Sequence, residues 1–156
     1  MSWDKDIKEI KQREKLALQQ GGKEAVGKQH NKGRKTLRER IEFILDKNSF
    51  DEIGKIAGSG VYDANEKLKD FIPANFLLGF GKINERHVII GGEDFTLKGG
   101  SPNPAGLRKS IYTEDLALKY KIPLVRLHEG GGGSVTGSGG SANKPTIPNS
   151  EPVFSK

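Results

Sequence analysis

Apolar residues recur at helical spacing in three segments of the chain, and each of these segments predicts a helix. In residues 4–20 the apolar positions are few and lie among charged residues, which indicates a helix with a thin apolar stripe. In residues 36–45, Thr36 is followed three positions later by Glu39, the capping-box pattern of a helix start. The third segment covers residues 104–121. We expect the first two helices to form an arm, with the first making few contacts to a sheet.

Strand-length apolar runs lie between and after these helices. Two of them, Phe76–Ile83 and His87–Ile90, are separated by a short turn and predict a hairpin. A shorter strand candidate covers residues 50–53, and residues 54–75 are rich in turn-forming residues. The last candidate, residues 123–128, follows the third helix and is expected to be buried, and a helix or tight turn is expected to start within residues 131–135. Strand, strand, helix and strand in this order form a β-β-α unit, which predicts an α/β fold with a layered sheet.

The last apolar run leads directly into glycines. Residues 122–129 are followed by Gly130-Gly-Gly-Gly-Ser-Val-Thr-Gly-Ser-Gly-Gly140 with no polar spacer between them. Glycine lets a ligand approach the backbone closely, and bare N–H groups at a helix start favour negative charge. This arrangement suits the stabilisation of an oxyanion on a reacting carbonyl. The same letters also spell a flexible Gly/Ser linker, so the glycines by themselves leave both interpretations open.

Composition narrows the class of protein. The 156 residues amount to one domain, yet only 33% are hydrophobic and 21 are glycine, which indicates a sparse core or a core completed by another segment. The absence of cysteine excludes disulfides, thiolate metal sites and a thiol nucleophile. No apolar signal region or membrane-length run is present. We therefore expect a soluble cytoplasmic protein, or a mitochondrial matrix protein in a eukaryote, although no transit peptide is seen.

The net charge of +6 is concentrated at the start of the chain, where residues 1–50 hold 13 Lys and Arg against 8 Asp and Glu. Basic segments often meet nucleic acid or other polyphosphates, although a solvated helix face produces the same pattern. Aromatic residues are not interleaved with the arginines, as binding to single-stranded nucleic acid would require. We expect neither a nucleic-acid partner nor a membrane partner.

Several motifs occur together in a family-like order. They are Gln29-His-Asn-Lys-Gly33-Arg-Lys-Thr36-Leu-Arg38-Glu39-Arg40-Ile41, Asp46-Lys-Asn-Ser-Phe-Asp-Glu-Ile-Gly54, Gly79-Phe-Gly81-Lys-Ile83 with Val88-Ile-Ile90, Asp94-Phe-Thr96 with Gly99-Gly100-Ser101 and Arg108-Lys109, and Pro123 to Gly133. Over residues 20–156 the chain resembles the carboxyltransferase β subunits of biotin-dependent acyl-CoA carboxylases, of the propionyl-CoA, acetyl-CoA and methylcrotonyl-CoA carboxylase type. The resemblance implies a crotonase-like (ClpP/crotonase) fold, a spiral of β-β-α units, and it favours the functional interpretation of the glycines.

Two departures from the family pattern qualify this resemblance. The family more often has Ser-Gly-Gly-Ala followed by Arg at the oxyanion turn, where this chain has Gly130–Gly133 followed by Ser134. Backbone donors survive that change, but a side-chain role of the arginine cannot be transferred. Family members are also longer and contain two crotonase-like halves, so the chain resembles an N-terminal fragment. The expected domains are a basic helical arm (1–47), an incomplete carboxyltransferase domain (48–140) and a loop or frayed tail (141–156).

The resemblance implies transfer of a carboxyl group from carboxybiotin, carried by a partner domain, to the α-carbon of an acyl-CoA through an oxyanion-stabilised enolate. By the same resemblance, backbone N–H groups of Gly131 and Gly132 are the catalytic oxyanion donors. Phosphates of CoA attract Arg and Lys, and glycine loops fit a channel wall. The CoA-binding residues that the resemblance implies are Arg38, Arg40, Gly99, Gly100, Ser101, Arg108 and Lys109. Biotin and the CoA thioester are the expected cofactor and substrate, and no metal is expected in this chain.

The expected partners are a biotin carboxylase or biotin carrier subunit, together with self-association of the full-length protein. Because a second oxyanion site and its positioning surface belong to the other half in this family, we expect the 156-residue chain alone to be inactive. Two alternatives stay open. One is a crotonase-type hydratase or isomerase, which would need a downstream acid/base that the chain lacks. The other is a non-catalytic assembly module in which the glycine-rich tail serves as a linker.

Overall fold

A computed structural model describes residues 2–101 and 103–129. The elements follow one another as α1 (Asp4–Ala17), α2 (Gly22–Asn31), α3 (Leu37–Ile44), β1 (Asp51–Glu52), β2 (Gly58–Tyr62), β3 (Leu68–Pro73), β4 (Phe76–Ile83), β5 (Arg86–Glu93), the 3₁₀ turn η1 (Lys98–Gly100), α4 (Pro104–Tyr120) and β6 (Leu124–Leu127). The predicted helices 4–20, 36–45 and 104–121 and the predicted strands are therefore confirmed, with ends shifted by a few residues.

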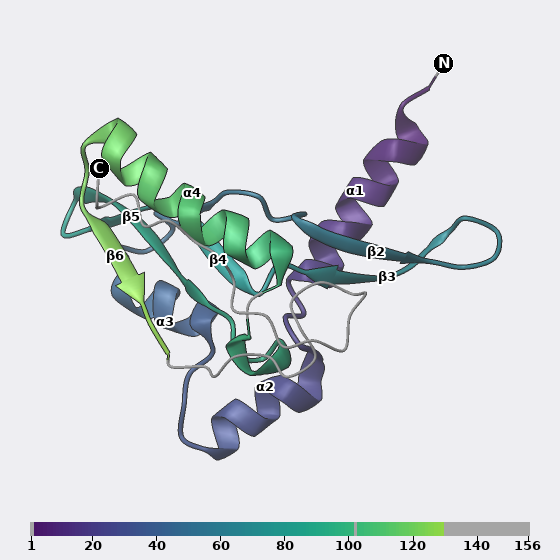
Figure 1. Cartoon of the computed structure of the whole chain (residues 1–156), viewed down its shortest axis with the longest axis horizontal. Coiled ribbons are helices and arrows are strands. Elements are labelled where there is room, and N and C mark those ends of the chain that lie inside the picture. Colours follow the sequence, from purple (N-terminus) through teal and green to yellow (C-terminus); the bar gives the residue numbers. More distant parts are fainter. Residues whose placement is uncertain (1, 102, 130–156) are drawn as a thin grey trace.

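The central sheet has the strand order β1-β4-β5-β6 (Figure 1). β4 and β5 form an antiparallel hairpin, and their turn residues Asn84 and Glu85 both have positive φ, as tight two-residue turns require. β5 and β6 are parallel, and α4 makes the crossover that a parallel pair needs. The β-β-α unit predicted from the sequence is confirmed.

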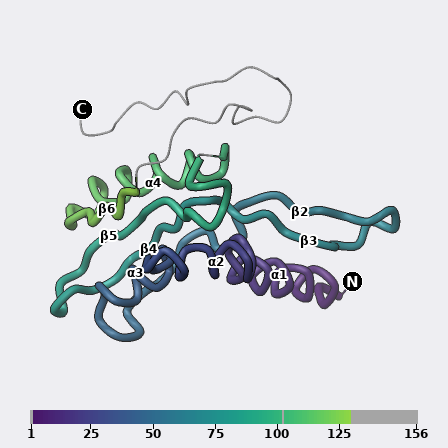
Figure 2. Tube along the Cα trace, turned by 90° about the horizontal axis from the view of Figure 1, so that it is seen from below, coloured from purple at the N-terminus to yellow at the C-terminus, as the bar shows by residue number. Residues whose placement is uncertain are grey.

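Both faces of β4 and β5 are covered, because α4 lies on one side of the sheet and α3 on the other (Figure 2). Successive side chains of a strand point to opposite faces, so neighbouring residues of each strand enter different cores. The residues on the α3 side include Leu77, Val88 and Ile90, and those on the α4 side are Phe76, Leu78 and Ile89, which pack with Leu116. A sheet buried on both faces explains why these strands are continuous apolar runs rather than alternating ones.

Helix α3 lies in the core rather than in an arm. Its capping box is present: Glu39 N donates to Thr36 Oγ1 at 3.4 Å, and Thr36 N donates to Glu39 Oε2 at 2.7 Å. Leu37, Ile41 and the C-cap residue Leu45 are buried against the sheet. Residues 36–46, which the sequence assigned to the helical arm, thus cover one face of the sheet. Their apolar face is wide enough to bury, whereas that of the first helix is not.

The N-terminal helix α1 runs along a hairpin of β2 and β3 that projects from the central sheet (Figures 1 and 2). Gln12 Nε2 donates to the carbonyl of Leu68 at 3.1 Å, and Ala17 is the buried residue of the helix. As expected from its thin stripe, α1 packs mainly on this hairpin, and it reaches the central sheet only near its end, where Ala17 lines a small cavity with Phe76 and Leu77 of β4. The hairpin was missed because its strands lie in the turn-rich stretch 54–75 and are exposed over much of their length.

Helix α2 was also missed. No element was predicted between residues 20 and 36, but Gly21 is the N-cap of this helix and Gly22 is its first residue. None of the residues of α2 is buried, so it has no apolar stripe for sequence analysis to find. Lys28 and Glu24, one turn apart, form an ion pair at 2.7 Å within the helix, and His30 Nε2 lies 2.9 Å from Glu39 Oε1 in α3.

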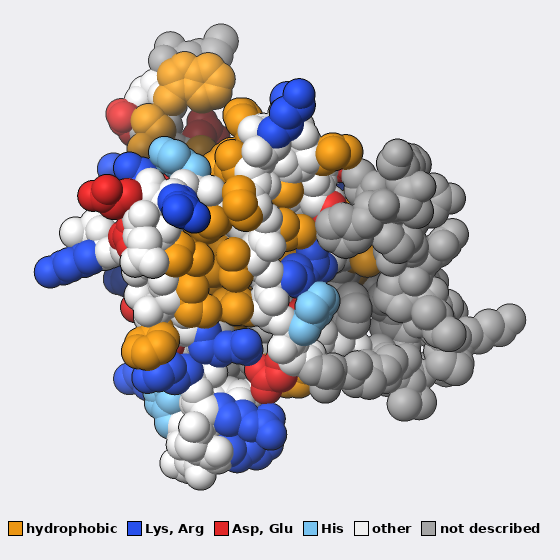
Figure 3. Space-filling model, turned by 90° about the vertical axis from the view of Figure 1, so that its left-hand side faces the viewer, with side chains coloured by type: hydrophobic (Ala, Val, Ile, Leu, Met, Phe, Trp, Pro, Cys, Tyr) orange, Lys and Arg blue, Asp and Glu red, His pale blue; other side chains and the backbone are white. Residues whose placement is uncertain are grey.

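Strand β6 is the edge of the sheet within the described part of the chain. The sequence predicted a buried strand, but Leu124, Val125 and Arg126 are half-buried and Leu127 alone in this strand is buried. Figure 3 looks onto this side of the molecule, where apolar side chains gather in the middle and charged ones surround them. The core is thus incompletely covered here, as the low hydrophobic content suggested. None of the helices within the described ranges has the length and apolar character to cross a bilayer.

Candidate functional site

The glycine loop after β5 is tightly wound. Lys98, Gly99 and Gly100 have φ values of 48°, 60° and 75°, so three successive residues adopt the left-handed conformation. Glycine is required at position 100, because a Cβ there would lie 2.3 Å from the ring of Phe95. The predicted site residues Gly99, Gly100 and Ser101 are therefore a tight turn, and Ser101 also faces a cavity.

Asn75 holds this loop in place, although sequence analysis had assigned it no role. Its side chain is buried and spans two segments: Nδ2 donates to the carbonyl of Ser101, and Oδ1 accepts from Asn103 N at 3.1 Å. The Asn75 carbonyl accepts from Asp94 N at 2.9 Å. Asn75 thereby ties the start of β4 to both ends of the loop, through its side chain at Ser101 and Asn103 and through its carbonyl at Asp94. A single buried Asn next to a strand gives no periodic signal, which is why the pattern did not reveal it.

Helix α4 begins at the same place. Its N-cap Asn103 accepts from Gly106 N at 2.6 Å through Oδ1, and Pro104 occupies the first turn, where its missing N–H costs nothing. Gly106 is needed for close approach, because a Cβ there would lie 2.2 Å from Asn75 Oδ1. The positive end of the helix dipole is therefore held beside the glycine loop.

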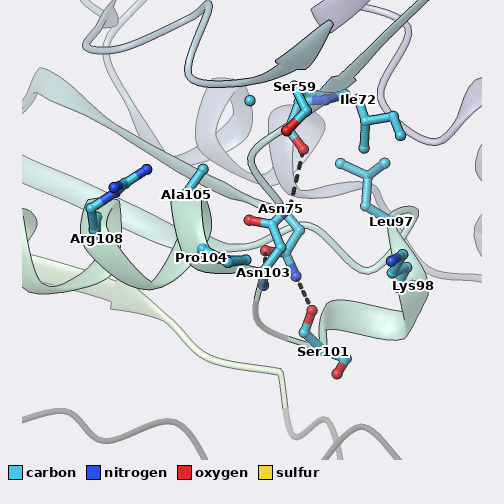
Figure 4. Close-up of a pocket in the computed structure, with 12 residues that line it drawn as sticks. Ser59, Ile72, Asn75, Leu97, Lys98, Ser101, Asn103, Pro104, Ala105 and Arg108 are labelled. Carbon is cyan, nitrogen blue, oxygen red and sulfur yellow. Dashed lines mark hydrogen bonds between the residues drawn. The ribbon is translucent and has the colours of Figure 1, made fainter. Parts of the chain in front are cut away.

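A cavity of about 260 Å³ lies between the β2–β3 hairpin, the glycine loop and the start of α4 (Figure 4). Among the described residues, its lining holds two cations, Lys98 and Arg108, and no carboxylate. Ser101 Oγ is buried without a hydrogen-bond partner among the described residues. The whole lining is Gly58, Ser59, Ile72, Pro73, Asn75, Leu97, Lys98, Ser101, Asn103, Pro104, Ala105 and Arg108. A cavity with apolar walls, two cations and a helix N-terminus suits a ligand that is apolar in part and anionic in part.

Arg38 and Lys109, both predicted to bind CoA, lie outside this cavity. Arg38 donates two hydrogen bonds to the Glu52 carboxylate, at 2.8 and 3.1 Å, and Lys109 Nζ donates to the carbonyl of Gly54 at 3.3 Å. The pKa of Lys109 is lowered to about 8, chiefly by burial; the Glu52 carboxylate opposes this shift and the Arg38 guanidinium adds to it. These residues and Asp94, whose pKa burial raises, line a second cavity of about 10 Å³. They form a buried charged cluster that joins α3, β1 and α4.

Arg40, the remaining predicted cation, lies near the end of β6. Its Nη1 lies 3.5 Å from Glu129 Oε2, and Arg34 Nη1 lies 3.2 Å from the other oxygen of the same carboxylate. Of the predicted cations, only Arg108 lines the larger cavity, and the structure does not bring Arg38, Arg40 and Lys109 to it. Gly131 and Gly132, the predicted oxyanion donors, lie outside the described residues, as does the helix or turn expected within 131–135. Their role stays a prediction.

Comparisons with known proteins agree with the sequence resemblance. The sequence model of the carboxyl transferase domain family matches residues 28–144. The chain is 34% identical over 134 residues to a propionyl-CoA carboxylase beta chain of Cereibacter sphaeroides, covering 84% of this chain and 26% of the relative. It is 32% identical over 115 residues to the methylmalonyl-CoA decarboxylase subunit alpha of Veillonella parvula, covering 74% of this chain and 23% of the relative.

The solved structures that resemble this fold are carboxyltransferases as well. The transcarboxylase 12S hexamer with methylmalonyl-coenzyme A and methylmalonic acid bound is similar with a TM-score of 0.66 and 28% identity, over 81% of this chain and 25% of that chain. The crotonase-like α/β fold predicted from the sequence is confirmed. The chain spans about a quarter of the length of the relatives it matches.

Proposed function

Because this chain belongs to the carboxyl transferase domain family, we propose that it forms the acyl-CoA-binding part of a biotin-dependent carboxyltransferase. The observation that carries the proposal is the cavity at the start of α4, with its two cations and no carboxylate. The relatives named above are a propionyl-CoA carboxylase, a methylmalonyl-CoA decarboxylase and a transcarboxylase with methylmalonyl-coenzyme A bound. An acyl-CoA is thus named for each of them. We therefore assign the cavity at the start of α4 to the binding of an acyl-CoA.

The cavity offers a separate contact for each part of CoA. Arg108 and Lys98 attract the phosphates, since guanidinium and ammonium groups form charge-assisted hydrogen bonds with phosphate oxygens. Ile72, Leu97 and the neighbouring prolines provide apolar walls for the pantetheine arm. At about 260 Å³ the cavity holds a portion of the ligand, and the rest extends along the surface.

The reaction that we propose for the full-length protein is carboxyl transfer to the α-carbon of an acyl-CoA. Removing the α-proton leaves negative charge on the thioester oxygen, and N–H donors aimed at that oxygen stabilise it; the loss of one donor costs about 10²–10³-fold in rate in comparable sites. We assign these donors to Gly131 and Gly132. Carboxybiotin from a carrier subunit would supply the carboxyl group, and the biotin nitrogen that loses this group would take up the α-proton. Self-association is part of the proposal, supported by the hexamer of the transcarboxylase neighbour.

Within this proposal the predicted cations have different roles. Arg108 is a ligand for the phosphates of CoA. Arg38 and Lys109 are engaged with Glu52 and Gly54 and support the site by fixing α3 and α4 to β1. Arg40 pairs with Glu129, one residue before the glycine run, and therefore holds the end of β6.

The test is CoA binding to the purified 156-residue chain by isothermal titration calorimetry. CoA, 3′-dephospho-CoA and pantetheine are compared at low and at physiological salt. We expect affinity to fall in that order and to weaken with salt. Arg108→Gln should weaken CoA binding about tenfold or more, because a charge-assisted hydrogen bond contributes about 1.5–3 kcal/mol. Lys119→Gln, an exposed change at the other end of α4, is the matched control and should have less than a twofold effect.

Absence of CoA binding by the wild-type chain, or equal affinity of the Arg108→Gln and wild-type chains, would refute the proposal. A second measurement uses free carboxybiotin and labelled acyl-CoA. We expect no carboxyl transfer by the 156-residue chain. It spans about a quarter of the length of its relatives, and a surface that positions biotin opposite the acyl-CoA is needed for the reaction.

A further inference from the structure

The glycine loop of the cavity rests on the junction between α1 and α2. Gly21 N, at the N-cap of α2, donates to Thr96 Oγ1 at 2.9 Å, although the two residues are 75 positions apart. Thr96 is buried and immediately precedes Leu97 and Lys98, which line the cavity. In Figure 1 the turn η1 lies directly beside the junction of α1 and α2. An N-terminal segment that looked like a separate arm therefore contacts the candidate site.

The contact is too close for any residue other than glycine at position 21. A Cβ there would lie 1.9 Å from the carbonyl oxygen of Thr96 and 2.5 Å from its carbonyl carbon, and both are backbone atoms that cannot rotate away. The flanking residues Gln20 and Gly22 have φ values of 56° and 86°, so the chain turns sharply on both sides of Gly21. The junction is thus shaped to present one backbone N–H to the loop.

Thr96 also belongs to a hydrogen-bond network that extends to the glycine loop. Its hydroxyl donates to Asp94 Oδ1 at 2.6 Å, and its N–H donates to the same oxygen at 2.9 Å. Asp94 N donates to the carbonyl of Asn75, and the Asn75 side chain donates to the carbonyl of Ser101. The network therefore connects the N-terminal helices with the carbonyl of Ser101, a residue that lines the cavity.

We propose that Gly21 and Thr96 are positioning residues of the acyl-CoA site, through which the N-terminal helices hold the glycine loop in its binding conformation. The inference rests on the proposed function, because it takes the cavity as the CoA site. It also extends that function to Gly21, which precedes the matched family region beginning at residue 28. The ligand itself touches neither residue, since neither lines the cavity.

The loop needs such support for a physical reason. A run of left-handed residues that includes the non-glycine Lys98 is sparsely populated by itself and persists only where surrounding contacts hold it. If the loop adopts its binding conformation only part of the time, the apparent dissociation constant rises in inverse proportion to that fraction. The loss of one holding hydrogen bond therefore weakens ligand binding without removing any ligand contact.

The experiment compares four variants of the 156-residue chain by calorimetric titration with CoA. Thr96→Val keeps the shape of the side chain but loses the hydroxyl, and should weaken CoA binding about 3- to 10-fold. Thr96→Ser keeps the hydroxyl and should restore binding to within twofold of the wild type. Gly21→Ala should weaken binding about tenfold or more, whereas Gly27→Ala, in the same helix with open space around it, should have less than a twofold effect.

Hydrogen exchange separates positioning from general destabilisation. In Thr96→Val the amides of residues 97–101 should exchange at least tenfold faster, while those of β4 and β5 keep their protection. If the amides of β4 and β5 accelerate equally, Thr96 supports the whole fold and the positioning role is refuted. If all four variants bind CoA as the wild type does, this inference fails while the proposed function stands. If the wild-type chain does not bind CoA, the proposed function fails, and unchanged exchange of the loop would then also exclude the positioning role.

Discussion

Replacing the buried Lys109 with methionine should stabilise the protein at neutral pH. The side chain is 8% exposed, and its ammonium group has the carbonyl of Gly54 as a hydrogen-bond acceptor at 3.3 Å. Glu52 lies close enough to favour the charge, but Arg38 already occupies both oxygens of that carboxylate. The charged lysine is therefore poorly compensated, and methionine fills similar space without the charge.

The size of the expected stabilisation follows from the pKa of Lys109, which is lowered from 10.5 to about 8, chiefly by burial. The unfolded chain binds the proton more tightly than the folded chain, so the protonated lysine costs about 3 kcal/mol of stability below pH 8, at 1.36 kcal/mol per unit of pKa. The cost decreases as the pH rises from about 8 to 10.5. Methionine removes it but leaves the Gly54 carbonyl without this donor, a loss of about 1 kcal/mol. The expected net gain for Lys109→Met is about 2 kcal/mol at pH 7.

Urea denaturation followed by circular dichroism at several pH values between 7 and 10 measures this gain. The difference between Lys109→Met and the wild type should be largest at pH 7 and should approach zero by about pH 10. Lys119→Met, an exposed change on the same helix, should alter stability by at most about 0.5 kcal/mol at every pH. A Lys109→Met protein that is less stable than the wild type at pH 7, or a gain that does not depend on pH, would refute the reasoning.

Three further changes test the core, the capping box and the support of the site, each by urea denaturation. Leu78→Ala should lower the free energy of unfolding by about 2–5 kcal/mol, because Leu78 is fully buried. Phe43→Ala, at a side chain that is 79% exposed, should lower it by at most about 0.5 kcal/mol. Similar losses for the two variants would contradict the assigned core. Thr36→Ala should cost about 1 kcal/mol through loss of the capping box, and an unchanged stability would show that the cap contributes nothing. Gly106→Ala should cost about 1–3 kcal/mol, because its Cβ would collide with Asn75 Oδ1, and a stabilised variant would contradict this packing.

Sequence analysis succeeded where short-range signals are strong. The capping box at Thr36 and Glu39, the run Phe76–Ile83 and the helix at residues 104–121 each depend on neighbours within a few positions, so their spacing alone predicted them. The order of these elements predicted the β-β-α unit, because a parallel strand pair needs a crossover helix. The family motifs lie in these same segments, which is why the resemblance and the pattern agree.

The elements that sequence analysis missed obtain their stability from distant contacts or show no apolar pattern. The β2–β3 hairpin is exposed over much of its length and packs on α1, some 50 residues earlier, through contacts such as that of Gln12 with Leu68. Helix α2 buries none of its residues, so no apolar period marks it. Whether α3 joined an arm or the core was likewise settled by the sheet that it covers, and not by its own sequence.

The same division applies to the candidate site. Residue type and motif pointed to Gly99, Gly100, Ser101 and Arg108, since glycine turns and cations are visible in the sequence. Arg38 and Lys109 carry the same charge as Arg108, but the fold directs them into a buried cluster, because Glu52 and Gly54 lie there. The sequence shows that a residue is cationic, but the packing of the elements decides which groups its side chain contacts. Only the tertiary structure could therefore separate the cation that faces the cavity from the two that hold the helices together.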